Sequence, residues 1–450
     1  MIVMKFGGSS VESAVAIERV AGIVRSRLKQ NPVVVVSAMG KTTNKLLAIG
    51  QAAIESQRGE ALNLLGELHA FHLEEAQGWA VNSEIEEHFA ELTGLVNGMA
   101  VMGEMTPRAT DAISAFGERL SSIIVTAGFR KYGLDAVQVD SRQVIVTDRR
   151  HTQATPVFRE TYQRLAGRVA PLALKQVVVM GGFIGATEDN VTSTLGRGGS
   201  DYTASIVGAG IDAEEIQIWT DVDGMLTADP AILPGGYRVR QCSFAEAAEL
   251  AYFGAKVLHP ATVLPAIEKN IPVRIVNSRR PEVEGTLITD EPPPSQSPIR
   301  SIACKKNITL VNIVSTRMLM AHGFLRRIFE IFDRHQTPVD MLATSEVSVS
   351  LTVDSADALV AIRKEIQEFA EVTVEEGQAI VCMVGDNIRH TPGVAGRAFS
   401  ALKQINIRMI SQGASRLNIS VAVAAEDLRG AVESLHREFF TDPDPAEFAA

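Results

Sequence analysis

Cysteine and long apolar runs are scarce in this sequence. Its 450 residues include only three cysteines, Cys242, Cys304 and Cys382, which form no CxxC pair and adjoin no histidine cluster. This spacing argues against a cysteine-ligated metal site and predicts free, buried thiols. No apolar stretch approaches the roughly 20 residues that cross a bilayer, and the short apolar start leads straight into a glycine pair, unlike a secretory signal. We therefore expect a cytoplasmic protein.

Positive charge is also in short supply. The chain has 43 basic and 53 acidic residues and a net charge of −10, which argues against nucleic-acid binding through bulk charge. Because acidic patches repel anions, any phosphate site must be built from local donors. The length exceeds one ordinary core and predicts two to four domains.

Short β-rich runs recur through the first 280 residues, with helical patterns between them. Most are continuously apolar, as expected for strands buried on both faces of a sheet. The alternation predicts an α/β domain over 1–290, a three-layer αβα sandwich with a mostly parallel sheet. Residues from about 42 to 131 are almost wholly helical in pattern and predict a helical subdomain. The six runs are Ile2–Phe6, Val33–Ser37, Ala136–Val139, Val177–Met180, Glu215–Thr220 and Val273–Val276.

A proline-rich polar segment at 291–300 predicts a linker. Beyond it, residues 301–450 contain two copies of a βαββαβ pattern, at about 307–377 and 378–441. The second copy lacks a sixth strand, because Thr441-Asp-Pro-Asp-Pro cannot form one. We expect the spare β run at 301–305 to complete the second sheet, so that the two α+β modules are intertwined.

Two glycine-containing loops follow the first two predicted strands. In Lys5-Phe-Gly-Gly-Ser-Ser, Gly7 and Gly8 allow close backbone approach to a phosphate, and the helix that follows supplies free N–H donors. A plain turn is the alternative. The second loop, Gly40-Lys41-Thr42-Thr43, is not a Walker A loop, because that motif needs a glycine where Val35 stands. Thr43 either faces a ligand or belongs to an N-capping turn.

The strongest local signal is Gly196-Arg-Gly-Gly-Ser-Asp201. Three glycines within four residues indicate a ligand-binding loop and not one shaped by packing, with a flexible surface loop as the alternative. Arg197 offers a planar fork for a carboxylate or phosphate. Asp201 would be repelled by a phosphate, so we interpret it as an organiser of Lys5 or Mg²⁺.

Other charged positions are weaker candidates. Thr220-Asp221 follows a buried strand, where open α/β sheets bind ligands, although turn chemistry explains the pair equally well. Glu118 and Lys256 would ordinarily be assigned to solvated surface.

Taken together, these segments resemble the aspartokinase branch of the amino-acid kinase family, of the monofunctional, lysine-sensitive type. The C-terminal repeats resemble ACT modules of ferredoxin-like fold. The matching motifs are Lys5-Phe-Gly-Gly-Ser-Ser, Ser37-Ala-Met-Gly, Gly117-Glu-Arg, Gly182-Phe-Ile-Gly, Thr194–Asp201, Trp219-Thr-Asp-Val and Phe253–Pro260.

The resemblance implies transfer of the γ-phosphate of ATP, with Mg²⁺, to the β-carboxylate of L-aspartate, the first step towards lysine, threonine and methionine. It implies that Lys5 and Asp201 are catalytic and that no residue is a dedicated metal ligand. The implied aspartate pocket consists of Thr43, Glu118, Phe183, Thr194, Arg197 and Ser200. The implied ATP site consists of Lys5, Phe6, Gly7, Gly8, Ser9, Thr220, Asp221, Lys256 and Val257. Some relatives carry an aromatic residue at Leu226 and an arginine at Ala231, so nucleotide contacts there are missing.

The resemblance also implies feedback inhibition by L-lysine at the ACT modules, with Asp340 as partner of the effector's ammonium group. The alternative is that these residues only pack a subunit interface. We expect a homodimer or a dimer of dimers assembled through the ACT modules. The implied effector residues are Met318, Gly323, Phe324, Leu325, Val339, Asp340 and Ser345.

Three other functions are alternatives. A kinase of the same fold acting on glutamate, carbamate or a nucleotide fits less well, because of the helical insertion and the paired repeats. A dinucleotide-dependent dehydrogenase lacks its G-x-G-x-x-G after the first strand. A silent amino-acid sensor is disfavoured by Lys5, Arg197 and Asp201.

Overall fold

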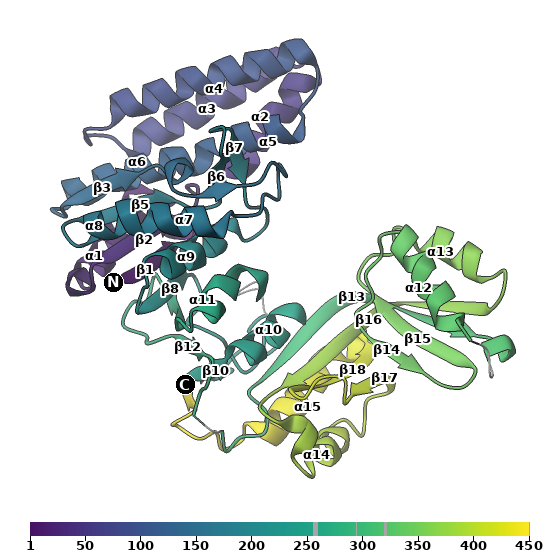
Figure 1. Cartoon of the computed structure of the whole chain (residues 1–450). Coiled ribbons are helices and arrows are strands. Elements are labelled where there is room, and N and C mark those ends of the chain that lie inside the picture. The colour runs from purple at the N-terminus through teal and green to yellow at the C-terminus, as the bar shows by residue number, and fades with distance from the viewer. Residues whose placement is uncertain (255–259, 294, 319–321, 450) are drawn as a thin grey trace. The chain divides into compact units, whose positions relative to one another are not determined.

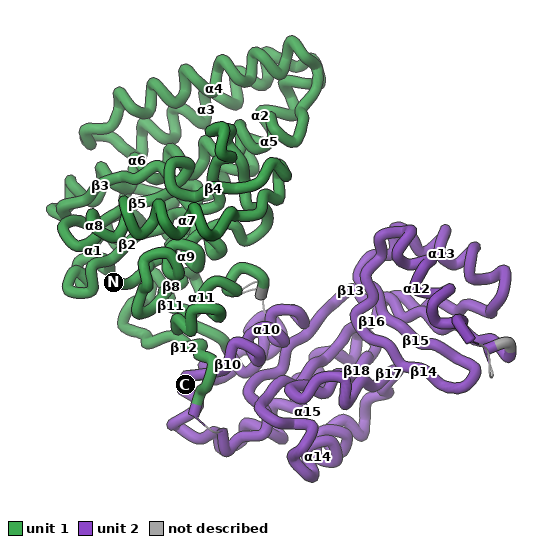
Figure 2. The backbone as a smooth tube through the Cα atoms, viewed as in Figure 1, with its two compact units in different colours: residues 1–225, 257–292 green, residues 226–256, 293–450 purple. Residues whose placement is uncertain are grey.

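The computed structural model describes residues 1–254, 260–293, 295–318 and 322–449. The chain divides into two compact units, residues 1–225 with 257–292 and residues 226–256 with 293–450 (Figure 2). The segment 226–256 thus groups with the C-terminal residues although it precedes the proline-rich stretch in sequence. Its backbone is bonded to that part of the chain: Ile302 N–H donates to Thr227 O at 2.8 Å. Within the described part of the chain, no helix is both long and apolar enough to cross a membrane.

The first unit is built on a mostly parallel sheet. Seven of its strands lie in the order β12-β11-β8-β1-β2-β5-β3, and only β12 runs antiparallel to its neighbour. Each of the six predicted runs is a strand, which confirms that part of the prediction. The bounds are β1 Ile2–Phe6, β2 Pro32–Val36, β3 Ala136–Val139, β5 Val177–Gly181, β8 Glu215–Thr220, β11 Val273–Asn277 and β12 Thr286–Thr289.

Helices cover both faces of this sheet, as Figure 1 shows. α1 (Ala14–Arg25) packs with α6 (Phe116–Lys131) on one face. α9 (Gly199–Gly210) lies on the other face against β1, β2 and β8. Shorter helices extend this second layer, namely α7 (Phe158–Arg164), α8 (Ala170–Ala173) and α11 (Leu264–Glu268). The strands between the layers are apolar on both sides because both sides are covered: every residue of β2 is buried.

Four helices between β2 and α6 form a stack over α6. α3 and α4 run alongside each other as a long pair (Figure 1). Their apolar faces join those of α1, α6 and β1 in one continuous hydrophobic core. The bounds are α2 Thr42–Ile54, α3 Arg58–Glu75, α4 Asn82–Met102 and α5 Pro107–Ser114.

A small second sheet of the first unit lies where the glycine-rich loop begins. It has the order β4-β6-β7, with β4 at Val146–Thr147, β6 at Ile184–Thr187 and β7 at Thr192–Thr194. α5 packs against β7. None of these three strands was predicted from the sequence, since each has only two to four residues.

The second unit contains one six-stranded antiparallel sheet of order β14-β15-β13-β16-β18-β17. Two of its strands are 14 residues long, β13 (Ser301–Val314) and β16 (Glu371–Val384). The other strands are β14 Leu342–Thr344, β15 Ser348–Val353, β17 Ile407–Gln412 and β18 Asn418–Ala424. The helices of this unit are α10 Phe244–Tyr252, α12 Phe324–Arg334, α13 Leu359–Ile366, α14 Val394–Ala401 and α15 Leu428–Phe439.

The two long strands correct the strand bounds expected from sequence. The run 301–305 was predicted to be separate from the first repeat, which was expected to start at about 307, but the two are continuous in β13 and joined across a bulge near Asn307. Ser301–Lys305 pairs with the end of β16, and Thr309–Val314 pairs with β15. Both repeats therefore draw on the same two strands. Residues 448–449 form a short strand, β19 (Phe448–Ala449), which pairs with β9 (Arg238–Val239).

Candidate active site

The glycine-rich loop owes its shape partly to backbone conformation and partly to packing. Gly196 and Gly198 have φ values of +77° and +72°, which favour glycine. A Cβ on Gly199 would lie only 2.6 Å from the Phe183 ring, so its glycine is required by close packing between the turn after β5 and the start of α9. The interpretation that packing does not account for these glycines is therefore wrong for Gly199.

Lys5 and Asp201 form an ion pair in this region. Lys5 lies near the end of β1 and Asp201 in the first turn of α9, and Lys5 Nζ lies 2.7 Å from Asp201 Oδ1. Their side chains are only 12% and 18% exposed. A largely desolvated pair retains more of its electrostatic attraction than a surface pair. The pair therefore holds a lysine ammonium group at the carboxyl edge of the sheet.

The loops after β1 and β2 touch at Gly8. A Cβ at this position would lie 2.8 Å from the carbonyl oxygens of both Ala38 and Gly40, while Gly40 N–H donates to Gly8 O at 3.0 Å. Gly8–Ser10 form a 3₁₀ turn that contains Ser9, and α1 begins only at Ala14, capped by Ser13. The glycine at position 8 thus lets two strand ends converge.

Glu118 is the deepest charged group of the site. It lies in the first turn of α6, 4% exposed, and its Oε1 accepts a hydrogen bond from Ala38 N–H at 3.2 Å. Its Oε2 has no hydrogen-bond partner among the residues that the structure describes. Burial raises the pKa of Glu118 to about 8, with the Ala38 hydrogen bond acting in the opposite direction. Its Oε2 is therefore open to a hydrogen bond from a ligand.

These groups face one cavity of about 360 Å³. Most of the residues predicted for the aspartate pocket line it, together with both predicted catalytic residues and Gly8. Ser37, Ala38 and Gly40 also line the cavity, although they were not predicted as site residues. The Ser37-Ala-Met-Gly motif after β2 is the sequence signal that could have identified them. The lining comprises Lys5, Gly8, Ser37, Ala38, Gly40, Thr43, Glu118, Phe183, Gly196, Arg197, Gly198, Gly199, Ser200 and Asp201.

Thr194 is the exception among the predicted pocket residues. It does not line the cavity, it is buried, and its hydroxyl donates to Asp111 Oδ1. Arg197, three residues later, is exposed at the cavity and has no carboxylate partner in the described part of the chain. The loop thus presents a free guanidinium while its first residue is anchored in the protein.

The candidates for the nucleotide site follow two adjacent strands. β1 and β8 are parallel neighbours in register, and Gly7 N–H donates to Trp219 O at 3.3 Å. Gly7–Ser9 and Thr220–Asp221 therefore lie at the same edge of the sheet. The Phe6 ring is buried and stacks on Trp219, so only its backbone is available to a ligand. Lys256 and Val257 lie outside the described residues.

Comparisons with known proteins agree with this geometry. The profile of the amino acid kinase family matches residues 1–277, and that of the ACT domain matches residues 311–369 and 381–439. Aspartokinase 1 of Arabidopsis thaliana chloroplasts is 40% identical over 99% of this chain and 81% of its own length. The chain belongs to the aspartokinases of the amino acid kinase family.

Solved structures of this family share the whole fold. Aspartokinase III of E. coli in complex with lysine and aspartate has 36% identity and a TM-score of 0.84, covering 98% of this chain and 99% of that one. The same enzyme with aspartate and ADP has a TM-score of 0.82 over 98% and 100% of the two chains. The predicted fold class, an amino-acid kinase sandwich followed by ACT modules, is confirmed.

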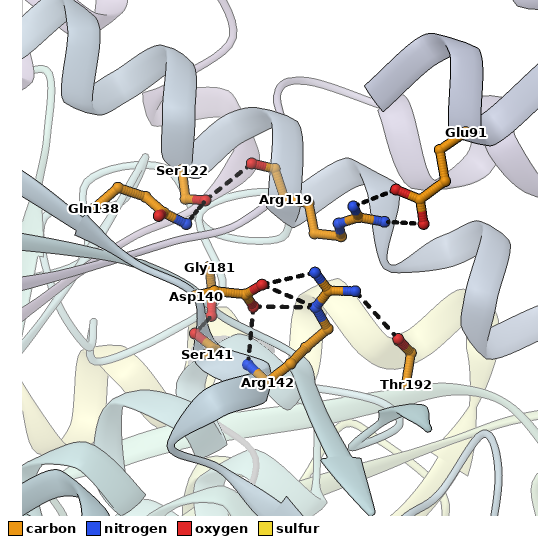
Figure 3. A network of polar contacts seen from close by, with 9 residues as sticks. All are labelled: Glu91, Arg119, Ser122, Gln138, Asp140, Ser141, Arg142, Gly181 and Thr192. Carbon is orange, nitrogen blue, oxygen red and sulfur yellow. Dashed lines mark hydrogen bonds and ion pairs between the residues drawn. The ribbon is translucent and has the colours of Figure 1, made fainter. Parts of the chain in front are cut away.

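A polar network supports the α6 turn that carries Glu118. Arg119 pairs with Glu91 of α4 through both terminal nitrogens, at 3.1 and 2.6 Å (Figure 3). Close by, Arg142 binds Asp140, with Nη2 2.6 Å from Oδ2. The hydrogen bonds from Arg119 lower the pKa of Glu91. At Asp140 burial raises the pKa, but the hydrogen bonds and charge of Arg142 outweigh it, so the pKa is lowered overall. The Arg119–Glu91 pair ties the start of α6 to α4, whereas the Arg142–Asp140 pair lies within the turn that follows β3.

The predicted effector residues lie in the first ACT module. Met318, Phe324 and Val339 pack against a single hydrophobic cluster of that module, and Gly323, with φ of +81°, precedes α12. Leu325 is the second residue of α12, and Ser345 follows β14.

Asp340 is already engaged within the second unit. Its Oδ1 accepts hydrogen bonds from Lys305 Nζ at 2.7 Å and from the Tyr252 hydroxyl at 2.9 Å. Burial raises the pKa of Asp340, against the influence of Lys305. Its Oδ2 has no hydrogen-bond partner among the described residues, so one oxygen remains for a further donor.

Proposed function

We propose that this chain transfers the γ-phosphoryl group of ATP to the β-carboxylate of L-aspartate, giving 4-phospho-L-aspartate and ADP. The observation that carries the proposal is the convergence, in one cavity, of the unpartnered Glu118 oxygen, the exposed Arg197 guanidinium and the Lys5–Asp201 pair. A structural relative binds aspartate and ADP.

The cavity offers complementary charges to a small amino acid. Arg197 can bind the α-carboxylate with its planar fork, and Glu118 can accept the α-ammonium through Oε2. Thr43 and Ser200 add hydroxyl groups to the same lining. A substrate held at both charges presents its side-chain carboxylate in a fixed direction, which lowers the entropic part of the barrier.

The chemistry needs charge neutralisation more than proton transfer. A carboxylate is already ionised at neutral pH, so no general base is required. The barrier is the approach of an anion to a polyanionic phosphate. Lys5 supplies a cation where β1 ends, and Asp201 fixes its position. Backbone amides of Gly8 and Ser9 add donors at the same edge, whereas the Gly7 N–H already donates to Trp219 O.

Magnesium is implied by this reaction, because it neutralises the charge of the nucleotide phosphates. Among the described residues, no group of three or more His, Cys, Asp or Glu side chains could hold a metal ion. Asp201 and Asp221 are the carboxylates at this sheet edge that would hold it.

The function is tested by an Mg·ATP-dependent assay that traps the acyl phosphate with hydroxylamine. We expect hydroxamate with L-aspartate and less than about a hundredth of that rate with L-glutamate, whose extra methylene misplaces the carboxylate. Equal or faster turnover of glutamate, or of carbamate, would reject aspartate as the substrate.

We further propose that L-lysine inhibits this kinase by binding at the first ACT module, in a cytoplasmic protein that forms a homodimer or a dimer of dimers through these modules. The free Asp340 Oδ2 supports recognition of an ammonium group. A structural relative binds lysine together with aspartate. An effector ammonium would share Asp340 with Lys305.

An inhibition assay with Asp340→Asn tests this regulation. The variant is expected to raise the lysine concentration for half-inhibition about tenfold or more, because a charge-assisted hydrogen bond is lost, with uninhibited turnover unchanged. Asp333→Asn on the exposed face of α12 serves as control. Inhibition only by threonine or methionine, or a variant as sensitive as the unmodified protein, contradicts the proposal.

A further inference from the structure

Asp111 is a buried carboxylate that belongs to no predicted site and does not line the cavity. It lies on α5 and is 0% exposed. His151 Nδ1 lies 2.7 Å from its Oδ2, and its Oδ1 accepts the Thr152 N–H at 2.9 Å and the Thr194 hydroxyl. Burying a carboxylate is costly unless it is fully hydrogen-bonded, and here three donors meet it.

Two of those donors belong to chain segments that enclose the start of the glycine-rich loop. Thr194 ends β7 and leads directly into the loop, and its carbonyl accepts the Ala154 N–H at 2.9 Å. Thr152 has a φ of +71°, which is strained for a β-branched residue. A Cβ on Gly196 would lie 3.2 Å from Thr152 O, so the strained turn packs directly on the loop.

Arg197 has no comparable anchor of its own. No carboxylate of the described chain pairs with its guanidinium, so its direction depends on the backbone of the loop. That backbone is fixed on one side by Thr194 and on the other by α9. The geometry explains why a carboxylate is buried and a threonine strained at a distance from the cavity.

We propose that Asp111 is a positioning residue for the amino-acid pocket. Together with His151 it holds Thr194 and the turn at Thr152, and through them the loop that aims Arg197 at the substrate carboxylate. Thr194 therefore acts through its bond to Asp111 and not by contact with substrate. The expected change in KM for aspartate rests on the proposed function, whereas the anchoring of the loop by Asp111 does not.

The test compares Thr194→Val, Thr194→Ser and Asp111→Asn in the full-length protein. We expect the valine and asparagine variants to raise KM for aspartate about tenfold or more, with KM for Mg·ATP within twofold. The serine variant keeps the hydroxyl and is expected to restore the unmodified KM. Thr161→Val is the matched control, because Thr161 is an equally buried threonine whose hydroxyl binds the Val146 backbone on β4, at the other edge of the small sheet from Thr194.

Limited trypsin cleavage after Arg197, mapped by mass spectrometry, gives a readout that does not require activity. Thr194→Val is expected to be cut several-fold faster there than the unmodified protein, Thr194→Ser or Thr161→Val. If the unmodified protein fails to phosphorylate aspartate, the proposed function falls while the cleavage test still decides the positioning role.

Three results would overturn the inference. The first is an unchanged KM and cleavage rate in Thr194→Val. The second is a serine variant as impaired as the valine variant. The third is additive effects of Asp111→Asn and Thr194→Val in the double variant, since two residues acting through one bond give a combined effect no larger than either alone. If Asp111→Asn does not fold, the comparison of valine, serine and control at Thr194 and Thr161 still decides.

Discussion

Glu118 places a carboxyl group where water does not reach it. With its pKa raised to about 8 by burial, it is mostly protonated at pH 7 in the free protein. Binding of a substrate ammonium group favours the ionised form, so a proton leaves as aspartate enters. Glu118 therefore lowers the free energy of unfolding of the ligand-free protein above pH 4.5, where the carboxyl ionises in the unfolded chain but not in the folded one.

Glu118→Gln is expected to change stability and function in opposite directions. Between pH 4.5 and about 8, Glu118 ionises in the unfolded state but stays protonated in the folded state, and this ionisation stabilises the unfolded state. The glutamine variant removes this difference, so its Tm at pH 7 should rise. Its kcat/KM for aspartate should fall about a hundredfold and lose the increase with pH towards 8.

Calorimetry and pH-dependent kinetics measure both effects. Glu84→Gln, an exposed position on α4, is the control. A lower Tm together with an unchanged pH profile would show that Glu118 is an ordinary structural carboxylate.

The sequence predicted the charged residues beside the glycine loops better than the buried carboxylates that lie behind them. Lys5, Arg197 and Asp201 stand beside glycines that mark ligand loops, so local pattern was sufficient to propose them. Glu118 was predicted as a site residue only through the family resemblance, and Asp111 was not predicted at all. A lone acid within a helical pattern is usually solvated, and only the tertiary approach of β2 and β7 buries these two.

At the scale of elements, the long strands β13 and β16 show where local pattern misleads. Asn307 and Gly377, both with positive φ, interrupt the apolar alternation and look like strand ends. The ladder between the two strands continues past both residues, through a register shift near 305–308. Pairing with a neighbour is non-local, and for that reason a single sequence does not reveal it. The buried parallel strands of the first unit were predicted because continuous burial leaves a continuous apolar run.

The helical stack carries its own pH dependence through His72 on α3. The imidazole is 0% exposed, its Nδ1 lies 2.8 Å from Leu68 O, and burial lowers its pKa to about 4. Between pH 6.5 and 4 the unfolded chain binds a proton that the folded chain does not. The contribution of neutral His72 to the free energy of unfolding is therefore fully present above pH 6.5. It decreases as the pH falls, and about 3 kcal/mol of it is lost at pH 4.

His72→Gln should flatten the dependence of unfolding free energy on pH over this window. Denaturant unfolding at pH 4.5, 5.5 and 6.5 measures it. His390→Gln, at an exposed position of the second unit, should leave the slope unchanged. An identical slope in His72→Gln and the unmodified protein would contradict a neutral, buried His72.

At the scale of the molecule, the chain joins a kinase fold to paired ACT modules, and each unit has its own core. The segment 226–256 is the feature that sequence could least reveal, because it lies within the span of the kinase profile yet groups with the C-terminal unit. Its Tyr252 hydrogen bonds to Asp340 of the first ACT module. The net acidic surface fits a site whose cations are held locally, as in the Lys5–Asp201 pair.

The most direct test of the central claim is turnover by Lys5→Ala in the hydroxylamine-trapping assay, with Lys29→Ala, an exposed lysine, as control. If Lys5 neutralises the phosphoryl group in transit, kcat falls about a hundredfold or more, while aspartate binding measured by calorimetry is retained. Near-normal turnover in Lys5→Ala would show that Lys5 does not neutralise the transferred group.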